Sequence, residues 1–491
     1  MTIKQVISLT LVSVMLLLTN ASLAGEPGDG GIKQKDAIGT EKSTLQEKQV
    51  FRPLRVACDS LDDFMEAGFT EAYPNIAVQH KPASGDDAIA LFAEQINLQS
   101  DEIDIFELPI GSTTQNMIDK GDYYPLNQDE SIREKMDAYR PFFRQIVIKD
   151  NDIAAIPRMA QQYTLAYSEF ALAQLGLGAA DMPSTFLELM DFLLTWNERV
   201  GDVARQAGVT PFGIPNEQVK VELLMMLMDQ YYALMAQNAS AIPLYEVDMA
   251  NLLDKLSRVC ATIPEGTVDE HHANSKERFG HIKVHNQRSY LFSVSGSFHP
   301  GRRSFVPYES VADFVPLALT LPSQDTPVLF FEGTLFIVNP YSSQKEQAIQ
   351  WLAFYMNHLP AKEAAVFDRN ALPLKSELYI GMKDYYASEI EKLTPQIEAA
   401  EGATKSNLEE QLQMKQDKLR ELAQIEWDVP AQALEDYEEI FVQSTVLWND
   451  PCKYADAFNP TYRKYLTEGM PGEAVAQAFF AIHEMLLKES R

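Results

Sequence analysis

The sequence has few cysteines, and only its N-terminal segment carries a long apolar run. Three cysteines, Cys58, Cys260 and Cys452, occur in 491 residues, too few for a disulfide framework. One pair can bridge in an oxidising compartment, and the sequence does not choose the pair. Their spacing matches no metal or redox motif. No stretch after the N-terminal segment is long and apolar enough to cross a membrane.

Basic side chains are also scarce. There are 41 Lys and Arg against 70 Asp and Glu, a formal net charge of −29. This balance argues against a nucleic-acid partner, because neutralising phosphates needs a basic surface. A hydrophobic content of 46 % with 10 % aromatics is that of a globular protein. The acidic surface is therefore interpreted as the well-hydrated exterior of a folded protein.

Enzyme motifs are missing as well. The chain contains no Gly-x-Ser-x-Gly, no His-Glu-x-x-His and no phosphate-binding loop. Carboxylate pairs such as Asp59 and Glu107 can in principle hydrolyse a glycosidic bond, but any acidic protein offers such pairs. The histidines at 271, 272, 281 and 285 lie in a polar, loop-like stretch, so we expect no metal and no cofactor.

Residues 1–24 have the pattern of a cleavable secretory signal. Lys4 gives the positive start, Val6–Leu18 the apolar run and Ser22–Ala24 the cleavage site. Glu26 stands where a lipoprotein would carry its lipid-bearing cysteine. The sequence thus predicts a periplasmic protein without a lipid anchor, although a retained anchor helix is an alternative.

The next residues predict a leader followed by an α/β domain. Residues 25–51 are polar and predict a flexible leader. Strand patterns at 54–57, 76–80 and 103–106 alternate with helical patterns at 61–72 and 86–98. This alternation predicts a largely parallel sheet covered by helices. Longer helices are predicted from Pro183 through Trp196 and over 219–236, where the methionines are interpreted as core.

Residues 378–428 predict a helical hairpin. Leucines recur at close to heptad spacing in its second half, and Gly402 and Ser406 lie between the halves. The two helices are either a solvated surface feature or an arm on which a partner docks.

Short segments along the whole chain carry a resemblance to a known family. Their order and spacing are more specific than any one of them. The segments are Leu54–Asp59, Asp104–Glu107, Ala154–Pro157 with Thr164–Tyr167, Phe292–Phe298, Phe331–Leu335 and Ala371–Pro373. In this layout the chain resembles the extracellular solute-binding proteins of bacterial ABC importers, the family 1 or maltose-binding-protein-like group, from about Arg52 to Lys488.

The resemblance implies an α/β fold of the type II periplasmic-binding-protein class, two-lobed, with a ligand cleft between the lobes and the helical hairpin as an addition. Lobe 1 would comprise 52–158 with 335–376. Lobe 2 would comprise 159–334 with 377–491, including the hairpin. Strand crossings between the lobes are expected near 156–163, 330–334 and 372–376.

Candidate ligand-binding residues follow from both the resemblance and the sheet. Ligands of open α/β sheets bind beyond the carboxyl ends of strands, where Asp59, Ser60 and Glu107 lie. Sugars need polar groups that bond hydroxyls, and aromatic faces beneath the ring. The resemblance adds residues at the crossings, and a Phe at 298 where Trp is commoner. The full set is Asp59, Ser60, Glu107, Arg158, Gln162, Tyr163, Ser297, Phe298, Glu332, Gly333 and Trp448.

Each candidate has a plainer interpretation. Asp59 can cap the following helix, Glu107 can be a solvated strand end, and Phe298 and Trp448 can be core aromatics. Arg158, with arginines at 302 and 303, raises an anionic sugar or a phosphorylated solute as an alternative ligand, since Arg binds carboxylates and phosphates well.

The expected function is therefore an exported, monomeric binding protein that captures a small solute by lobe closure. The expected solute is a carbohydrate, and the expected partner is the membrane permease of an ABC transporter. The alternatives are a sensor that presents its closed form to a membrane receptor kinase, and a secreted glycoside hydrolase.

Overall fold

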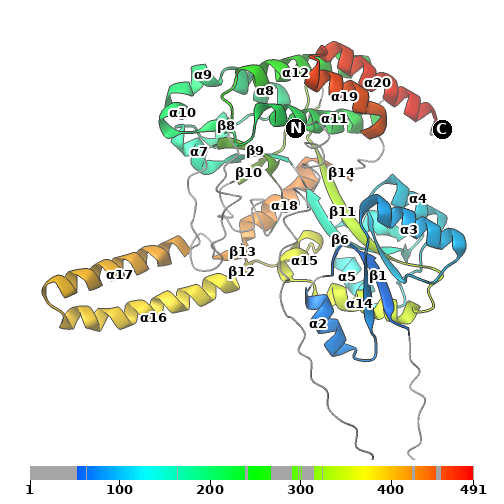
Figure 1. The fold of residues 1–491 in the computed structure, drawn as a ribbon, viewed down its shortest axis with the longest axis horizontal. Helices are drawn as coiled ribbons and strands as arrows, with labels where there is room; N and C mark the ends of the chain where they lie inside the picture. The colour runs from blue at the N-terminus through cyan, green and yellow to red at the C-terminus, as the bar shows by residue number, and fades with distance from the viewer. Residues whose placement is uncertain are drawn as a thin grey trace, which may run out of the picture. The chain divides into compact units, whose positions relative to one another are not determined.

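The computed structural model describes the chain from Arg52 onward, with gaps. The described residues are 52–61, 63–162, 164–237, 242–266, 290–296, 298, 300, 314–322, 324–422, 426–448 and 455–489. The expected signal and leader lie outside them. The chain divides into two units, Met1–Phe51 and Arg52–Arg491. The second unit contains two hydrophobic cores, each with its own sheet (Figure 1).

The sheet of the first core has six strands. Its order is β14-β11-β3-β1-β2, with β6 also paired to β11. The first three strands along the chain are parallel to one another, as the alternating pattern predicts. The strands are β1 (Leu54–Cys58), β2 (Val78–Pro82), β3 (Ile105–Pro109), β6 (Ala155–Gln162), β11 (Val328–Val338) and β14 (Thr445–Trp448).

The central element of this sheet is β11. It runs antiparallel to both β3 and β6 and parallel to β14. The register places Phe331 opposite both Gln162 and Trp448, whereas Phe336 lies opposite Glu107. One strand therefore brings together segments that are far apart in the sequence.

Helices cover this sheet because their apolar residues recur on one face. In α3, for example, Ala88 and Phe92 lie one turn apart and are both buried in the first core. The elements around this core are α2 (Asp63–Ala72), α3 (Gly85–Leu98), α4 (Ser112–Lys120), α5 (Glu130–Ala138), α6 (Pro141–Val147), β4 (Ile148–Lys149), β5 (Asp152–Ile153), α14 (Lys345–His358), α15 (Ala361–Phe367) and α18 (Ala431–Gln443).

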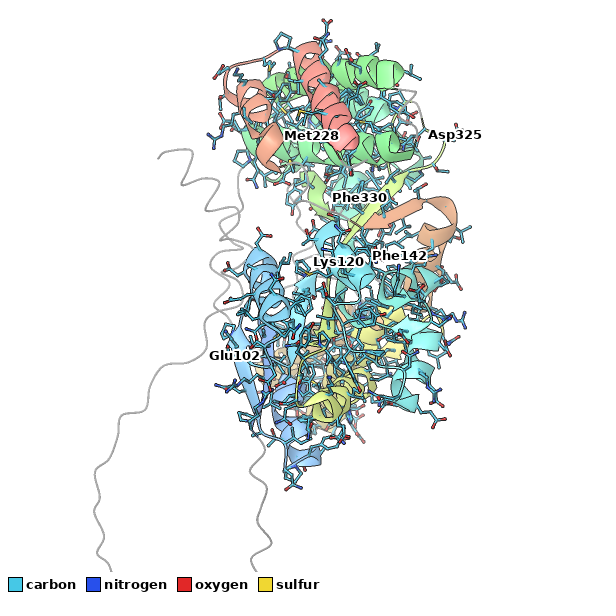
Figure 2. The ribbon with its side chains drawn as sticks, turned by 90° about the vertical axis from the view of Figure 1, so that its right-hand side faces the viewer. Glu102, Lys120, Phe142, Met228, Asp325 and Phe330 are labelled. Carbon is cyan, nitrogen blue, oxygen red and sulfur yellow. The ribbon has the colours of Figure 1, made fainter. Side chains whose placement is uncertain are left out.

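The second core is built on a four-stranded sheet of order β10-β7-β9-β8. Its helices α11, α12, α19 and α20 pack on one another (Figure 1). The elements are β7 (Thr164–Ser168), α7 (Glu169–Gln174), η1 (Ala179–Asp181), α8 (Phe186–Leu194), α9 (Trp196–Arg199), α10 (Gly201–Ala207), β8 (Thr210–Phe212), α11 (Asn216–Gln237), α12 (Ile242–Thr262), β9 (Tyr290–Gly296), β10 (Phe314–Leu317), α19 (Ala455–Thr467) and α20 (Gly472–Glu489). The methionine-rich helix α11 contributes to this core through Met228 (labelled in Figure 2) and Met235, as predicted, whereas Met225 is 42 % exposed and does not.

The helical hairpin is confirmed. Helices α16 (Glu377–Ala399) and α17 (Gly402–Leu422) lie side by side (Figure 1), with Leu393 buried. Strands β12 (Leu374–Lys375) and β13 (Trp427–Val429) pair antiparallel at its base. The segment therefore leaves and re-enters the body of the protein at one place.

Two details differ from the sequence analysis. The second strand, β2, begins at Val78 and not at Ile76, because the backbone N–H of Ile76 donates to Tyr73 O (3.0 Å) in a turn. Helix α18 contributes Tyr437 and Ile440 to the first core, although the expected lobe division groups it with α19 and α20. No helix among the described residues is long and apolar enough to span a membrane.

Candidate functional site

Four of the candidate residues meet beside the carboxyl end of β1. The sequence analysis places Glu107 after a strand at 103–106, but β3 spans Ile105–Pro109 and Glu107 lies within it. The two strands are parallel neighbours, with Ala57 opposite Phe106, so Asp59 lies beside the part of β3 that contains Glu107. The backbone N–H of Asp59 donates to Glu107 Oε2 (3.3 Å). Arg158 donates from Nη1 to the same oxygen and from Nη2 to Ser60 O (2.7 Å). These four residues form the strand-end cluster.

The strand-end cluster contains a nearly buried ion pair. The Glu107 and Arg158 side chains are 7 % and 12 % exposed. The guanidinium carbon of Arg158 lies 5.3 Å from the centroid of the Phe336 ring, and Tyr355 Oη donates to Arg158 O (3.1 Å). Separating the two side chains would leave a nearly buried charge without its partner, which is unfavourable. The ion pair therefore keeps its geometry.

Part of the strand-end cluster faces solvent. Asp59 and Ser60 are exposed. The Asp59 carboxylate makes no hydrogen bond or ion pair with another described residue, and neither does Glu107 Oε1. The cluster thus offers carboxylate acceptors that a hydroxyl or ammonium group can use.

Gln162 and Phe298 form a second contact. Gln162 ends β6, is fully buried, and accepts a hydrogen bond at Oε1 from the backbone N–H of Phe298 (3.1 Å). Phe298 follows β9 of the second sheet but packs, half-buried, against the first core. Tyr163 and Ser297, the candidates beside them, lie outside the described residues, as do the four histidines and the arginines at 302 and 303.

Gly333 and Trp448 belong to an aromatic layer on β11. The Trp448 ring is half-buried and stacks on Phe142 of α6 (labelled in Figure 2), with centroids 4.8 Å apart and an interplanar angle of 14°. A side chain on Gly333 would meet Met159 O at 2.4 Å and Trp448 Cζ3 at 3.0 Å. The glycine therefore permits the close approach of β6 and Trp448 to β11.

Glu332 points to residues that the sequence analysis missed. It is exposed on β11, and its negative charge, after burial as the larger cause, helps raise the pKa of Asp229 on α11 to about 7. The neighbouring Gln230 donates from Nε2 to Val328 O. Asp229 and Gln230 are polar residues within a long apolar helix, and this contrast was the feature of the sequence that could have marked them as candidates. Their partners on β11 lie about a hundred residues away and could not be identified from the sequence.

The described part of the chain contains two cysteines, Cys58 and Cys260, and no group of three or more His, Cys, Asp or Glu residues that could hold a metal ion. Cys58 is buried in the first core, and Cys260 packs against the second. Neither forms a disulfide with another described cysteine. Burial raises the pKa of the Cys260 thiol to about 12, so its reactive thiolate is disfavoured.

Known structures match this chain over most of its length. The binding protein MsmE of Bacillus subtilis, in an open conformation, is 13 % identical with a TM-score of 0.52, covering 90 % of this chain and 99 % of that one. A protein from Caldanaerobius polysaccharolyticus, described for xylan utilization, is 12 % identical with a TM-score of 0.51, covering 88 % and 99 %. The GacH receptor of Streptomyces glaucescens, solved unliganded and with acarbose, is 11 % identical with a TM-score of 0.50, covering 89 % and 99 %.

No protein-family model and no curated protein matches the sequence. At these identities the structural matches establish the fold. The matched chains are covered almost completely, and the helices and the two sheets of this chain agree with their fold. The expected fold class is therefore confirmed. The chain has the two-lobed α/β fold of the solute-binding proteins that it resembles.

Proposed function

We propose that the protein is an exported solute-binding protein that captures a carbohydrate and delivers it to the permease of an ABC transporter. The proposal rests on the fold and on one observation, the strand-end cluster. The exposed carboxylate of Asp59 lies there beside the nearly buried carboxylate of Glu107, which Arg158 holds in place. Carboxylate oxygens accept hydrogen bonds from sugar hydroxyls, and Asp59 follows the carboxyl end of β1, where ligands of open α/β sheets bind.

The mechanism we propose is a population shift between open and closed lobes. Lobe 1 would comprise 52–158 with 335–376 and also α18, which contributes Tyr437 and Ile440 to the first core, and lobe 2 the remainder of the folded part. A ligand that contacts both lobes only when they are closed stabilises the closed form, which the permease then recognises. Residues 1–24 would direct export to the periplasm and be removed, leaving a monomer without a lipid anchor.

A ligand screen tests the proposal. The probes are maltotriose, cellotriose, xylotriose and acarbose, with turnover of each sugar monitored by chromatography. Saturation with a true ligand stabilises the fold by about 2.7 kcal/mol at 100 times its dissociation constant. We expect at least one saccharide to raise the melting temperature without being cleaved. Cleavage would contradict a transport role, and no shift with any saccharide would contradict a carbohydrate ligand.

Site variants locate the binding. Glu107→Gln keeps the side-chain shape and removes one acceptor charge, so we expect sugar affinity to fall roughly tenfold or more, the loss of a charged hydrogen bond. Glu134→Gln is the matched control, because Glu134 is exposed on α5 and outside the strand-end cluster. Equal affinity in the two variants would place the ligand elsewhere. Urea unfolding of each variant separates a loss of binding from a loss of stability.

A further inference from the structure

We propose that the strand-end cluster selects saccharides carrying an ammonium group and discriminates against sugar acids and sugar phosphates. The inference deepens the proposed carbohydrate-binding function and rests on it. From the sequence alone, Arg158 raises an anionic sugar or a phosphorylated solute as the ligand. The inference differs from this because Arg158 forms an ion pair with Glu107. What the cluster presents to a ligand is carboxylate.

The guanidinium of Arg158 is occupied by the protein itself. Nη1 donates to Glu107 Oε2 and Nη2 to Ser60 O, while the guanidinium lies over the Phe336 ring. Only 12 % of its side chain is exposed. An anionic ligand would have to displace Glu107, and the nearly buried carboxylate would then lose its counter-charge. Arg158 therefore positions Glu107 and is not available to an anion.

Glu107 keeps one oxygen for a ligand. Its side chain is more than nine-tenths buried, at 7 % exposed, and Oε2 receives both Arg158 Nη1 and the Asp59 N–H. Oε1 bonds no other described residue. A carboxylate can only accept hydrogen bonds, so Oε1 is complementary to a donor.

Asp59 supplies the charge that is not balanced. Two carboxylates, Asp59 and Glu107, and one guanidinium, Arg158, leave the cluster at −1, located on the exposed Asp59 side chain. A hydroxyl can satisfy these acceptors, and an ammonium group does so with three donors and an opposite charge. A carboxylate or phosphate on the ligand would instead meet Asp59 with a like charge. For a pair that involves an exposed carboxylate, attraction of this kind changes affinity by up to about fivefold.

The test compares trisaccharides that share a β-1,4 backbone and differ in charge. Calorimetry at low salt and about pH 6, where an amine is protonated, would use the glucosamine trimer, its N-acetylated form, cellotriose and the corresponding trimer of glucuronate, with maltotriose as an α-linked probe. We expect the glucosamine trimer to bind up to about fivefold more tightly than the neutral sugars, and the glucuronate trimer most weakly. Raising the salt to about 0.5 M should reduce the difference, because exposed charges are then screened.

Two variants assign the effect to the cluster. Asp59→Asn should abolish the preference for the ammonium sugar over the neutral sugars, because the variant keeps one acceptor oxygen and loses the charge. Glu134→Gln removes the same charge elsewhere and should retain the preference. If neutral and ammonium sugars bind equally, or the glucuronate trimer binds best, the charge inference is overturned while carbohydrate binding stands. If none of the five saccharides binds, the inference falls together with the proposed function.

Discussion

The guanidinium carbon of Arg140 lies 5.0 Å from the centroid of the Tyr437 ring. The Arg140 side chain connects three segments of the first core. Its Nη1 donates to the carbonyl oxygens of Ala365 (2.8 Å) and Val366 (2.7 Å) in α15, and its Nε donates to Glu438 (2.6 Å) in α18. The Arg140 side chain is 3 % exposed. A residue at the start of α6 therefore holds both α15 and α18.

Replacing this arginine should be costly. In Arg140→Met, two buried carbonyl groups lose their donor, and unsatisfied buried acceptors cost about 1–3 kcal/mol each. We expect the free energy of unfolding to fall by about 2–4 kcal/mol, measured by urea denaturation. Glu438→Gln is the control, because Glu438 is 48 % exposed and exposed ion pairs contribute about 1 kcal/mol or less. Equal losses in both variants would contradict the role assigned to the carbonyl contacts.

Gly333 should tolerate no side chain. A Cβ there would lie 2.4 Å from Met159 O, a backbone atom of the paired strand β6. Gly333→Ala must separate the two strands, and we expect a loss of about 2 kcal/mol or more in unfolding free energy. Gly381→Ala is the matched control in the exposed helix α16, with nothing within 4 Å of the added carbon. It should stabilise by about 0.5–1 kcal/mol, because alanine favours helix. Similar effects at both sites would refute the close approach.

The free energy of unfolding should decrease as the pH rises, because Asp229 loses its proton. Burial, and then the charge of Glu332, raise the pKa of this carboxyl from 3.8 to about 7. The folded state therefore binds the proton more tightly than the unfolded state. This contribution is complete below about pH 4 and is lost as pH rises to about 7.

The test measures urea unfolding at about pH 5 and about pH 8, on either side of that upper limit. The wild type should lose more stability between these pH values than Asp229→Asn, which cannot titrate. Glu332→Gln should show an intermediate loss, because it removes only the like charge. The same pH dependence in all three proteins would show that Asp229 does not titrate in this range.

The hairpin should be removable. Lys375 and Trp427 are paired across β12 and β13, and Ser376 N donates to Glu426 O (3.0 Å). Replacing 376–426 with Asn-Gly should convert the two strands into a tight β-hairpin. We expect a soluble protein that unfolds cooperatively and binds the same saccharides, with helix content reduced in circular dichroism. Aggregation of this variant would show instead that the hairpin covers apolar surface of the body.

Local features were predictable from the sequence, and long-range ones were not. The hairpin at 378–428, the first parallel strands and the methionine-rich helix follow from patterns within one segment, because periodicity reports which face is buried. Asp59 and Glu107 were both expected beyond strand ends. Asp59 does follow β1, but Glu107 lies within β3, because that strand runs from Ile105 to Pro109 and not from 103 to 106.

The remaining details depend on which distant segments pair. Nothing near Arg158 in the sequence shows that its partner is Glu107, so the sequence favoured a solvated surface arginine and left an anionic ligand as the alternative. The placement of α18 in the first core and the Gln230 contact with β11 likewise depend on chain segments about 100 residues or more apart. Hydrophobic patterning predicts that such residues are buried, and it does not predict against what.

The pairing of β11 also constrains the order of folding. This strand requires β3 and β6, which are made long before it, and β14, which is made more than a hundred residues after it. Closing loops of this length costs entropy before any contact repays it, so the sheet forms slowly. The first core therefore cannot be completed until Trp448 has been synthesised. If the chain is exported as proposed, we expect this late completion to lengthen the time in which it remains unfolded enough to be translocated.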